Sequence, residues 1–400
     1  MEVSAEKIMW KPSSRLKSIF SILIFVGVVS LIFALYQDKT RAWHAYLLGL
    51  FYFTSLALGG LFFTSIQHLT NSGWSVNIRR PMEALTAFLP WAFGLTLIFI
   101  AGNFVSGMDV FDWFNKATVE SDALLAHKEA YLNPSFFIIR TIIFFVGWLW
   151  LAKKIIGYSL KQDETGEHSL THKCVPLSIA FILFFSLSYS LFSVDTLMSL
   201  EAHWFSTIFG VYTFAGLFQC TLCVMILIIG HLLKKGLINK YVNENHLHDL
   251  GKFLFGFVVF WAYIAFSQYM LIWYANLPEE TIFFKPRQEG TWLLVSFSLI
   301  IFKFIVPFFA LLPRWAKRNI NHLSAVSVLI LVMQVVDLYW LIYPNLNKEH
   351  SFVLGFQDIG IFLGFLGLFI YTTTKFLSSH SIIPHKDPRM YESNAHEVVY

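Results

Sequence analysis

The sequence predicts an all-α polytopic membrane protein with about ten transmembrane helices. Of its 400 residues, 56% are apolar and only 14% are charged, whereas soluble domains carry about 25% charged residues. This small number of charged residues cannot cover a water-facing surface. Lipid must therefore face much of the chain. The apolar runs approach the roughly 20 residues that a spanning helix needs. They are continuous rather than alternating, which favours helices over the strands of a barrel.

The expected spans are ten apolar runs in chain order. They cover residues 16–36, 43–69, 83–105, 133–155, 175–194, 204–233, 250–277, 290–312, 322–343 and 352–376.

We group these spans into two four-helix bundles, 16–160 and 175–312, followed by two additional helices within 322–376. Residues 1–15 form a short N-terminal segment. The tail, 377–400, is polar and is expected to be flexible unless a partner orders it.

Lysine and arginine favour one orientation. With the N-terminus inside, the inner segments hold 20 of these residues and the outer segments hold 7, while Arg140 and Lys303 lie within spans. The positive-inside rule therefore places both termini in the cytoplasm. The longest outer connection, about 104–132, is acidic. It suits either a docking surface for an outer partner or a solvated loop, and its aromatic residues could lie at the membrane interface.

The first eight spans fit two copies of one four-helix unit in the same orientation. Such parallel repeats are related by an axis along the membrane normal. The match is one of position rather than of sequence. The corresponding residues are His68 with His231, Glu83 with Asp249, and Arg140 with Lys303.

Ionisable residues near the outer side form the first candidate site. Asp195, Glu201 and His203 are close in sequence, with Arg140 and Asp337 within plausible reach. A cluster of carboxylates and a histidine could take protons from a bound quinol. The alternative is a corner that caps helices and anchors a loop at the level of the headgroups.

A second candidate set lies at the inner side. It comprises His68, Glu83, His231, Asp249 and Lys252. Glu83 and Asp249 stand where helix N-termini favour negative charge, which is sufficient to explain them. The functional alternative is proton uptake from the cytoplasm.

Polar residues between these sets could bridge them. Tyr263, Ser267 and Tyr274 share one helical face, and Gln268 lies on an adjoining face. These groups, with Gln334 and Asp337 one turn apart on another span, could conduct protons or simply hold the helices together by hydrogen bonds.

The two cations within spans require partners. We expect Asp337 to pair with one of Lys303 and Arg140, and Glu201 or Asp195 to pair with the other.

No motif for a redox centre or a nucleotide is present in the sequence. Cys220-x-x-Cys223 is followed by Val224 rather than histidine, so it does not match a haem c attachment site. Phosphate-binding loops and iron–sulfur cysteine sets are also absent from the sequence. The net charge of +4 is modest and does not indicate nucleic-acid binding. We therefore expect a cofactor-free helical bundle with an embedded polar path.

Three segments resemble the F subunit of bacterial alternative complex III, a member of the polysulfide-reductase type of membrane anchors. They are Ser193–Gly210 (SVDTLMSLEAHWFSTIFG), His248–Phe257 (HDLGKFLFGF) with its continuation Phe260–Thr281 (FWAYIAFSQYMLIWYANLPEET), and Val336–Pro344 (VDLYWLIYP).

This resemblance implies a multi-pass subunit of a quinol:cytochrome c or quinol:oxidase oxidoreductase in the bacterial cytoplasmic (inner) membrane. The implied partners are a sister membrane subunit of the same fold, multihaem cytochrome c subunits, an iron–sulfur subunit and membrane lipid. Haem c and iron–sulfur clusters then belong to the partners, and quinol binding fits the sister subunit better. For this chain the implied role is structural and proton-conducting.

The resemblance carries over only residues inside the matching segments. They are Asp195, Glu201, His203, Asp249, Lys252, Tyr263, Ser267, Gln268 and Asp337.

Four further candidates, His68, Glu83, Arg140 and Lys303, rest on the physical argument alone. Two other functions remain open at this stage. One is direct quinol binding in this chain near Glu201 and His203. The other is a stand-alone proton-coupled secondary transporter.

Overall fold

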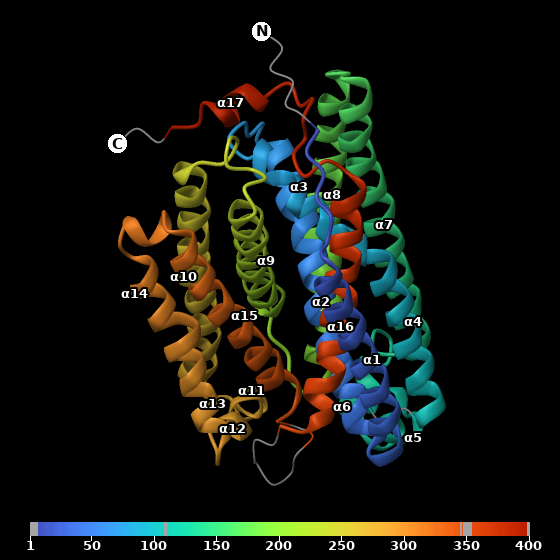
Figure 1. Ribbon diagram of the computed structural model, residues 1–400. Helices are drawn as coiled ribbons and strands as arrows, with labels where there is room; N and C mark the ends of the chain where they lie inside the picture. Colours follow the sequence, from blue (N-terminus) through green and yellow to red (C-terminus); the bar gives the residue numbers. More distant parts are fainter. Residues whose placement is uncertain (1–6, 108–109, 345, 347–353, 398–400) are drawn as a thin grey trace.

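The expected all-α polytopic fold is confirmed by a computed structural model, which describes residues 7–107, 110–344, 346 and 354–397. The protein is 80% helical, and the described part contains no strand. Ten of its helices are long and apolar enough to cross a membrane, and they run side by side along one axis (Figure 1). Residues 1–6, 108–109, 352–353 and 398–400 of the expected segments lie outside the described residues.

The spanning helices match the expected runs one for one, with shifted ends. They are α1 (Ser14–Gln37), α2 (Lys39–Leu69), α3 (Val76–Leu85) continuing through the 3₁₀ turn η1 (Thr86–Phe88) into α4 (Leu89–Ser106), α7 (Pro134–Thr165), α8 (Ser169–Thr196), α9 (Phe209–Lys234), α10 (Glu244–Ala275), α13 (Trp292–Ser298) continuing through the π-helical segment η4 (Leu299–Ile305) into α14 (Val306–Leu311), α15 (Ile320–Ile342) and α16 (Phe356–Ser379).

Short helices form the connections between the spans. They are η2 (Asp112–Phe114), α5 (Lys116–Ser121), α6 (Ala123–Lys128), η3 (Met198–Glu201), α11 (Pro278–Thr281), α12 (Phe284–Arg287), η5 (Trp315–Lys317) and α17 (Met390–Asn394).

Side-chain caps fix where several spans begin. The Asp38 carboxylate accepts the backbone N–H of Arg41 at the start of α2. Asn133 caps α7, which has Pro134 as its first residue. Asn319 caps α15 in the same way. Such caps satisfy backbone N–H groups that have no partner within the helix.

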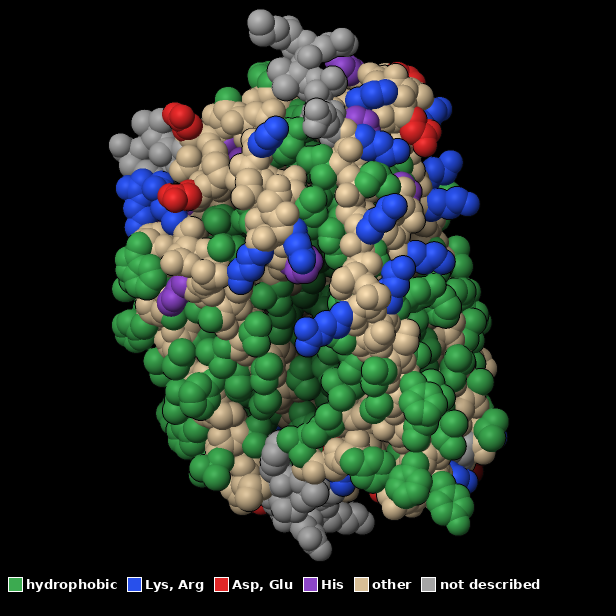
Figure 2. Space-filling model, in the orientation of Figure 1, with side chains coloured by type: hydrophobic (Ala, Val, Ile, Leu, Met, Phe, Trp, Pro, Cys, Tyr) green, Lys and Arg blue, Asp and Glu red, His purple; other side chains and the backbone are tan. Residues whose placement is uncertain are grey.

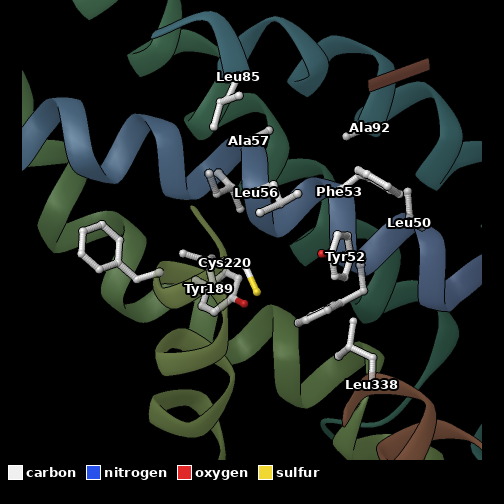
Figure 3. Close-up of a cluster of buried hydrophobic side chains, with 14 of the residues drawn as sticks. Leu50, Tyr52, Phe53, Leu56, Ala57, Leu85, Ala92, Tyr189, Cys220 and Leu338 are labelled. Atoms are coloured by element: carbon white, nitrogen blue, oxygen red, sulfur yellow. The ribbon is translucent and has the colours of Figure 1, made fainter. Parts of the chain in front are cut away.

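The helices pack as two four-helix groups. The first consists of α2, α4, α7 and α8, and the second of α9, α10, α13–α14 and α15. Helix α2 also contacts α9 and α15 and therefore joins the two groups. Figure 3 shows Leu50, Phe53 and Leu56 of α2 in a buried cluster with Tyr189 of α8 and Cys220 of α9.

The first and last spans pair with each other outside these groups. A Cβ placed on Gly27 of α1 would lie 2.2 Å from the Cα of Gly364 in α16, so only glycine allows the two backbones to approach so closely. This grouping differs from the expected division into 16–160 and 175–312. The bundles are shifted by one helix because the small residues of α1 and α16 hold these two helices together.

The aromatic residues of the long connection between α4 and α7 are buried in the protein. Phe111, Trp113 and Phe114 are almost fully covered and surround the ring of Phe137. The Trp113 indole also donates to the backbone oxygen of Ser199 at 3.2 Å. These residues therefore pack inside the protein against α7 and the η3 turn, and a position at the level of the membrane interface stays a prediction.

The C-terminal tail is ordered by the chain itself, which corrects the expectation of flexibility for its described part. The backbone N–H of Ile382 donates to the oxygen of Ile8 at 3.0 Å. Further along, the Ser393 hydroxyl accepts the N–H of Asn77. Helix α17 thus lies across the end of the molecule where α3 begins (Figure 1).

Both termini lie at the same end of the molecule (Figure 1). We call this end the termini end and the opposite end the loop end. On the face shown in Figure 2, lysine and arginine side chains gather toward the termini end above a broad hydrophobic surface. This distribution agrees with the charge bias of the sequence, and the assignment of the termini end to the cytoplasm stays a prediction.

Candidate functional site

A buried ion pair lies in the core of the second bundle. The Lys303 ammonium group is 2.6 Å from the Asp337 carboxylate and 2.6 Å from the Gln334 side-chain oxygen. Lys303 and Asp337 are 0% and 1% exposed. The second carboxylate oxygen of Asp337 accepts the hydroxyl of Tyr212. The expectation that Asp337 pairs with one of the two membrane cations is confirmed.

Lys303 reaches this position from the middle of the π-helical segment η4. Pro307 follows four residues later, so it has no N–H to donate to the carbonyl of Lys303 and its ring crowds that carbonyl. Such a break is relieved by widening the helix, and single π turns often occur at functional sites. The ammonium group also lies 4.1 Å from the ring centre of Trp261 in α10. These neighbours shield the charge from lipid.

A small cavity adjoins the ion pair where the two bundles meet. Its volume of about 10 Å³ is close to the room that one water molecule needs. Its lining combines Ser55 and Tyr189 of the first bundle with Tyr212, Gln334 and Asp337 of the second. Hydroxyl, amide and carboxylate groups thus meet around a water-sized space.

Helices α9 and α15 extend this polar environment toward the termini end. A Cβ at Gly216 would lie 2.6 Å from the Gln334 oxygen, so the glycine makes room for the amide. Gln219 lies seven residues after Tyr212 on the same face of α9. It is fully buried, and neither atom of its amide has a hydrogen-bond partner among the described residues. Buried amides are almost always satisfied, so this one is suited to bind water.

The expected bridging face of α10 points away from the bundle. Tyr263 and Tyr274 are 64% and 84% exposed, and Ser267 is half-buried. Of the four expected bridging residues on α10, Gln268 alone is buried inside, where it accepts the hydroxyl of Ser206 at 3.1 Å. The expected polar line through Tyr263 and Ser267 is wrong, because the core-facing side of α10 is another face.

The first bundle contains a second buried ion pair. Arg140 of α7 donates to both oxygens of Asp195 in α8, at 3.0 and 3.1 Å. It also donates to the backbone oxygen of Tyr131, and its guanidinium lies over the rings of Tyr131 and Phe136. This pairing confirms the expectation for Arg140. A planar guanidinium held by two parallel bonds has little freedom to move.

Glu201 has a different partner that lies in a connection. Arg287 of α12 is fully buried and is 2.8 Å from the Glu201 carboxylate. It also donates to the backbone oxygens of Trp340 and Leu341. Burial lowers the pKa of Arg287, although the neighbouring Glu201 carboxylate opposes this effect. Arginine nevertheless stays charged at any physiological pH. The sequence argument missed Arg287 because nothing in the sequence marks an arginine of a loop as buried.

His203 has a partner of its own in a different connection. Its Nε2 atom is 2.6 Å from Asp122 of the α4–α7 connection, and its side chain is 47% exposed. The backbone N–H of Leu125 lowers the pKa of Asp122. Asp195, Glu201 and His203 are thus each held by a different partner, which is Arg140, Arg287 and Asp122 respectively. Their joint action as a proton-accepting cluster stays a prediction.

At the termini end, Glu83 is the centre of a buried network. It accepts from Arg80 at 2.7 Å and from Ser159 at 2.8 Å. Arg79 joins Glu83 to Asp387 of the tail, with the Asp387 contact at 2.6 Å. The sequence argument missed Asp387 because it treated the tail as unstructured.

The other expected members of the inner set lie apart from Glu83. Asp249 is 2.7 Å from Lys252 and 2.7 Å from His396 of the tail. The Nε2 atom of His68 is buried and has no hydrogen-bond partner in the part of the chain that the structure describes. His231 contacts the ring of Trp10 edge-on, with centroids 5.8 Å apart. The inner set is thus divided between the two bundles, and the tail connects both parts.

Within the described residues, no group of three or more His, Cys, Asp or Glu side chains is placed to hold a metal ion. Cys174, Cys220 and Cys223 are free, buried thiols. The groups around Lys303 can hold charge and exchange protons through hydroxyls and water.

No model of a known protein family matches the chain, and no curated protein matches its sequence. The resemblance to alternative complex III therefore remains an expectation that rests on the three segments quoted above.

Proposed function

We propose that this chain is a membrane subunit of a quinol:cytochrome c or quinol:oxidase oxidoreductase of the bacterial inner membrane, with both termini in the cytoplasm. Its role in the proposal is to hold the complex together and to conduct protons through buried polar groups. The observation that carries the proposal is the buried group of Lys303, Asp337 and Tyr212 beside a water-sized cavity. Ionisable groups at such depth are costly and usually mark an ion or proton path.

Proton exchange within this group needs only small movements. Asp337 lies between an ammonium group and a phenol hydroxyl. Transfer of one proton from Lys303 to Asp337 converts the ion pair into two neutral groups, which a low-dielectric interior tolerates better than separated charges. Water in the adjoining cavity and at the unpartnered amide of Gln219 would continue the path toward the termini end.

In this proposal the redox centres belong to partner subunits. Multihaem cytochrome c subunits and an iron–sulfur subunit carry the electrons, and a sister membrane subunit of the same fold takes the quinol. The pairing of Glu201 with Arg287 and of His203 with Asp122 supports this assignment. A quinol that bound near these residues in this chain would first have to displace those contacts.

Purification from the native host tests the proposal. The N-terminus is the better place for a tag, since the described tail is packed on the protein. We expect a mild-detergent preparation to bring down haem c, visible in its absorption spectrum, and an iron–sulfur protein. Recovery of a lone, colourless chain would contradict the proposal. If that lone chain supported proton-coupled solute uptake in vesicles, it would be a secondary transporter.

A further inference from the structure

A groove opens between α9 and α16 in the half of the molecule nearer the termini end. Its volume is about 330 Å³. Figure 2 faces a hollow with hydrophobic walls and with basic side chains at its upper edge. The groove is lined by Trp10, Leu16, Val224, Leu227, Ile228, His231, Leu232, Phe369, Ile370, Thr373, Thr374 and Leu377.

The walls of this groove belong to membrane-spanning segments. Residues 224–232 are the last turns of the α9 span, and 369–377 are the last turns of the α16 span. An apolar groove at this depth faces acyl chains rather than water. Hydrocarbon is therefore the natural filling for its deep part.

One polar group inside the groove has nothing to bind within the described protein. Thr373 is 6% exposed, and its buried hydroxyl lacks a hydrogen-bond partner among the described residues. A hydroxyl that is left unpaired in an apolar environment is costly. If the Thr373 side chain rotates toward the groove, its hydroxyl can donate to an ester carbonyl of a bound ligand.

The end of the groove nearest the termini is basic. His231 lines the groove and contacts Trp10. Lys234 and Lys235 lie about one turn beyond His231, and Lys11 follows Trp10 directly. All three lysines are exposed. Basic pockets between helices at this membrane surface recognise anionic headgroups.

We propose that this groove binds an anionic phospholipid. One acyl chain occupies the apolar part, the Thr373 hydroxyl donates to an ester carbonyl, and the phosphate lies among His231, Lys234, Lys235 and Lys11. The occupant follows from the combination of hydrocarbon walls, one unpaired donor and a cationic end. This inference does not depend on the proposed role in quinol oxidation.

Lipid binding to the purified, delipidated protein tests the proposal. Native mass spectrometry would compare phosphatidylglycerol with phosphatidylcholine of identical acyl chains. We expect the wild-type protein to retain phosphatidylglycerol about fivefold better. The double variant Lys234→Gln, Lys235→Gln should lose this preference. The matched control Lys153→Gln, Lys154→Gln changes another exposed pair of adjacent lysines and should keep it.

A variant that fills the groove distinguishes this site from general surface charge. Ile228→Trp should reduce retention of phosphatidylglycerol while the protein keeps its thermal unfolding midpoint. Equal retention of the two lipids by the wild type, or an unchanged preference in the Lys234, Lys235 variant, would overturn the proposal. Isoprenoid quinone that remained bound in the wild type and was displaced by Ile228→Trp would also overturn it, because the groove would then be a quinone site.

Discussion

Arg140 and Lys303 lie on the third helix of their bundles, and each is paired with a carboxylate on the fourth. Arg140 is 3.0 Å from Asp195, and Lys303 is 2.6 Å from Asp337. The expected repeat matched Arg140 with Lys303, and the shifted bundles extend the match to the two carboxylates. A common origin of the two bundles stays a prediction, which these positions support.

Loss of one partner of the Lys303–Asp337 pair should destabilise the protein strongly. Lys303→Met leaves the Asp337 charge buried without a counter-charge, at a cost of about 3–5 kcal/mol. Thermal unfolding in detergent would measure this loss. The double variant Lys303→Met, Asp337→Leu should be more stable than Lys303→Met, since no charge is left unpaired. If the double variant lost as much stability as the sum of its single changes, the two groups would not act as a pair.

The close contact between α1 and α16 should depend on Gly27. Gly27→Val pushes a side chain into the backbone of Gly364, so we expect α1 to separate from α16. Cross-linking between cysteines introduced on the two helices should fall. Gly157 of α7 has nothing within 4 Å of an added Cβ. Gly157→Val is therefore the control. An equal effect of both variants would contradict the prediction that α1 and α16 are held together at Gly27.

Arg287 should be essential for the loop end of the second bundle. Arg287→Met removes bonds to Glu201 and to the backbone oxygens of Phe283, Trp340 and Leu341. Because Glu201 is then left without its cation, we expect a loss of about 2–5 kcal/mol in unfolding free energy. Lys285→Met, at an exposed position of the same short helix, is the control. Wild-type stability in Arg287→Met would show that the buried pair contributes nothing.

Docking of the tail should weaken in acid through His385. Burial lowers the pKa of His385 from its ordinary 6.5, and Lys386, Arg80 and Lys7 add to this, whereas Asp163 opposes it. A detached tail then binds a proton more readily than the docked tail. Docking is therefore unaffected well above pH 6.5 and weakens as the pH falls below 6.5.

Limited proteolysis of the tail at about pH 5.5 and about pH 7.5 would measure this dependence. His385→Gln should remove most of the difference between the two pH values. His172→Gln, at an exposed position, corrects for the response of the protease. A difference that persisted in His385→Gln would assign the pH dependence to another group.

The sequence was sufficient for the spans because hydrophobic length alone defines them. It also restricted the partners of Arg140 and Lys303 to Asp337 and to Glu201 or Asp195, since few carboxylates share their depth, but only the fold assigns each carboxylate to its cation. It was not sufficient to orient α10. The sequence predicted that the polar face with Tyr263 points into the bundle, but Tyr263 is exposed on the outside. Arg287 and Asp387 were missed because their burial depends on tertiary contacts between a loop or the tail and distant helices.

The proposed place of the chain in quinol oxidation is tested most directly by deleting its gene in the native host. Membranes of the deletion strain would be assayed for quinol-dependent reduction of cytochrome c, with the wild-type gene supplied in trans as the control. We expect the chain's absence to abolish most of this activity and its return to restore it. Unchanged quinol oxidation without the chain, in membranes that still contain all haem c subunits, would contradict the account.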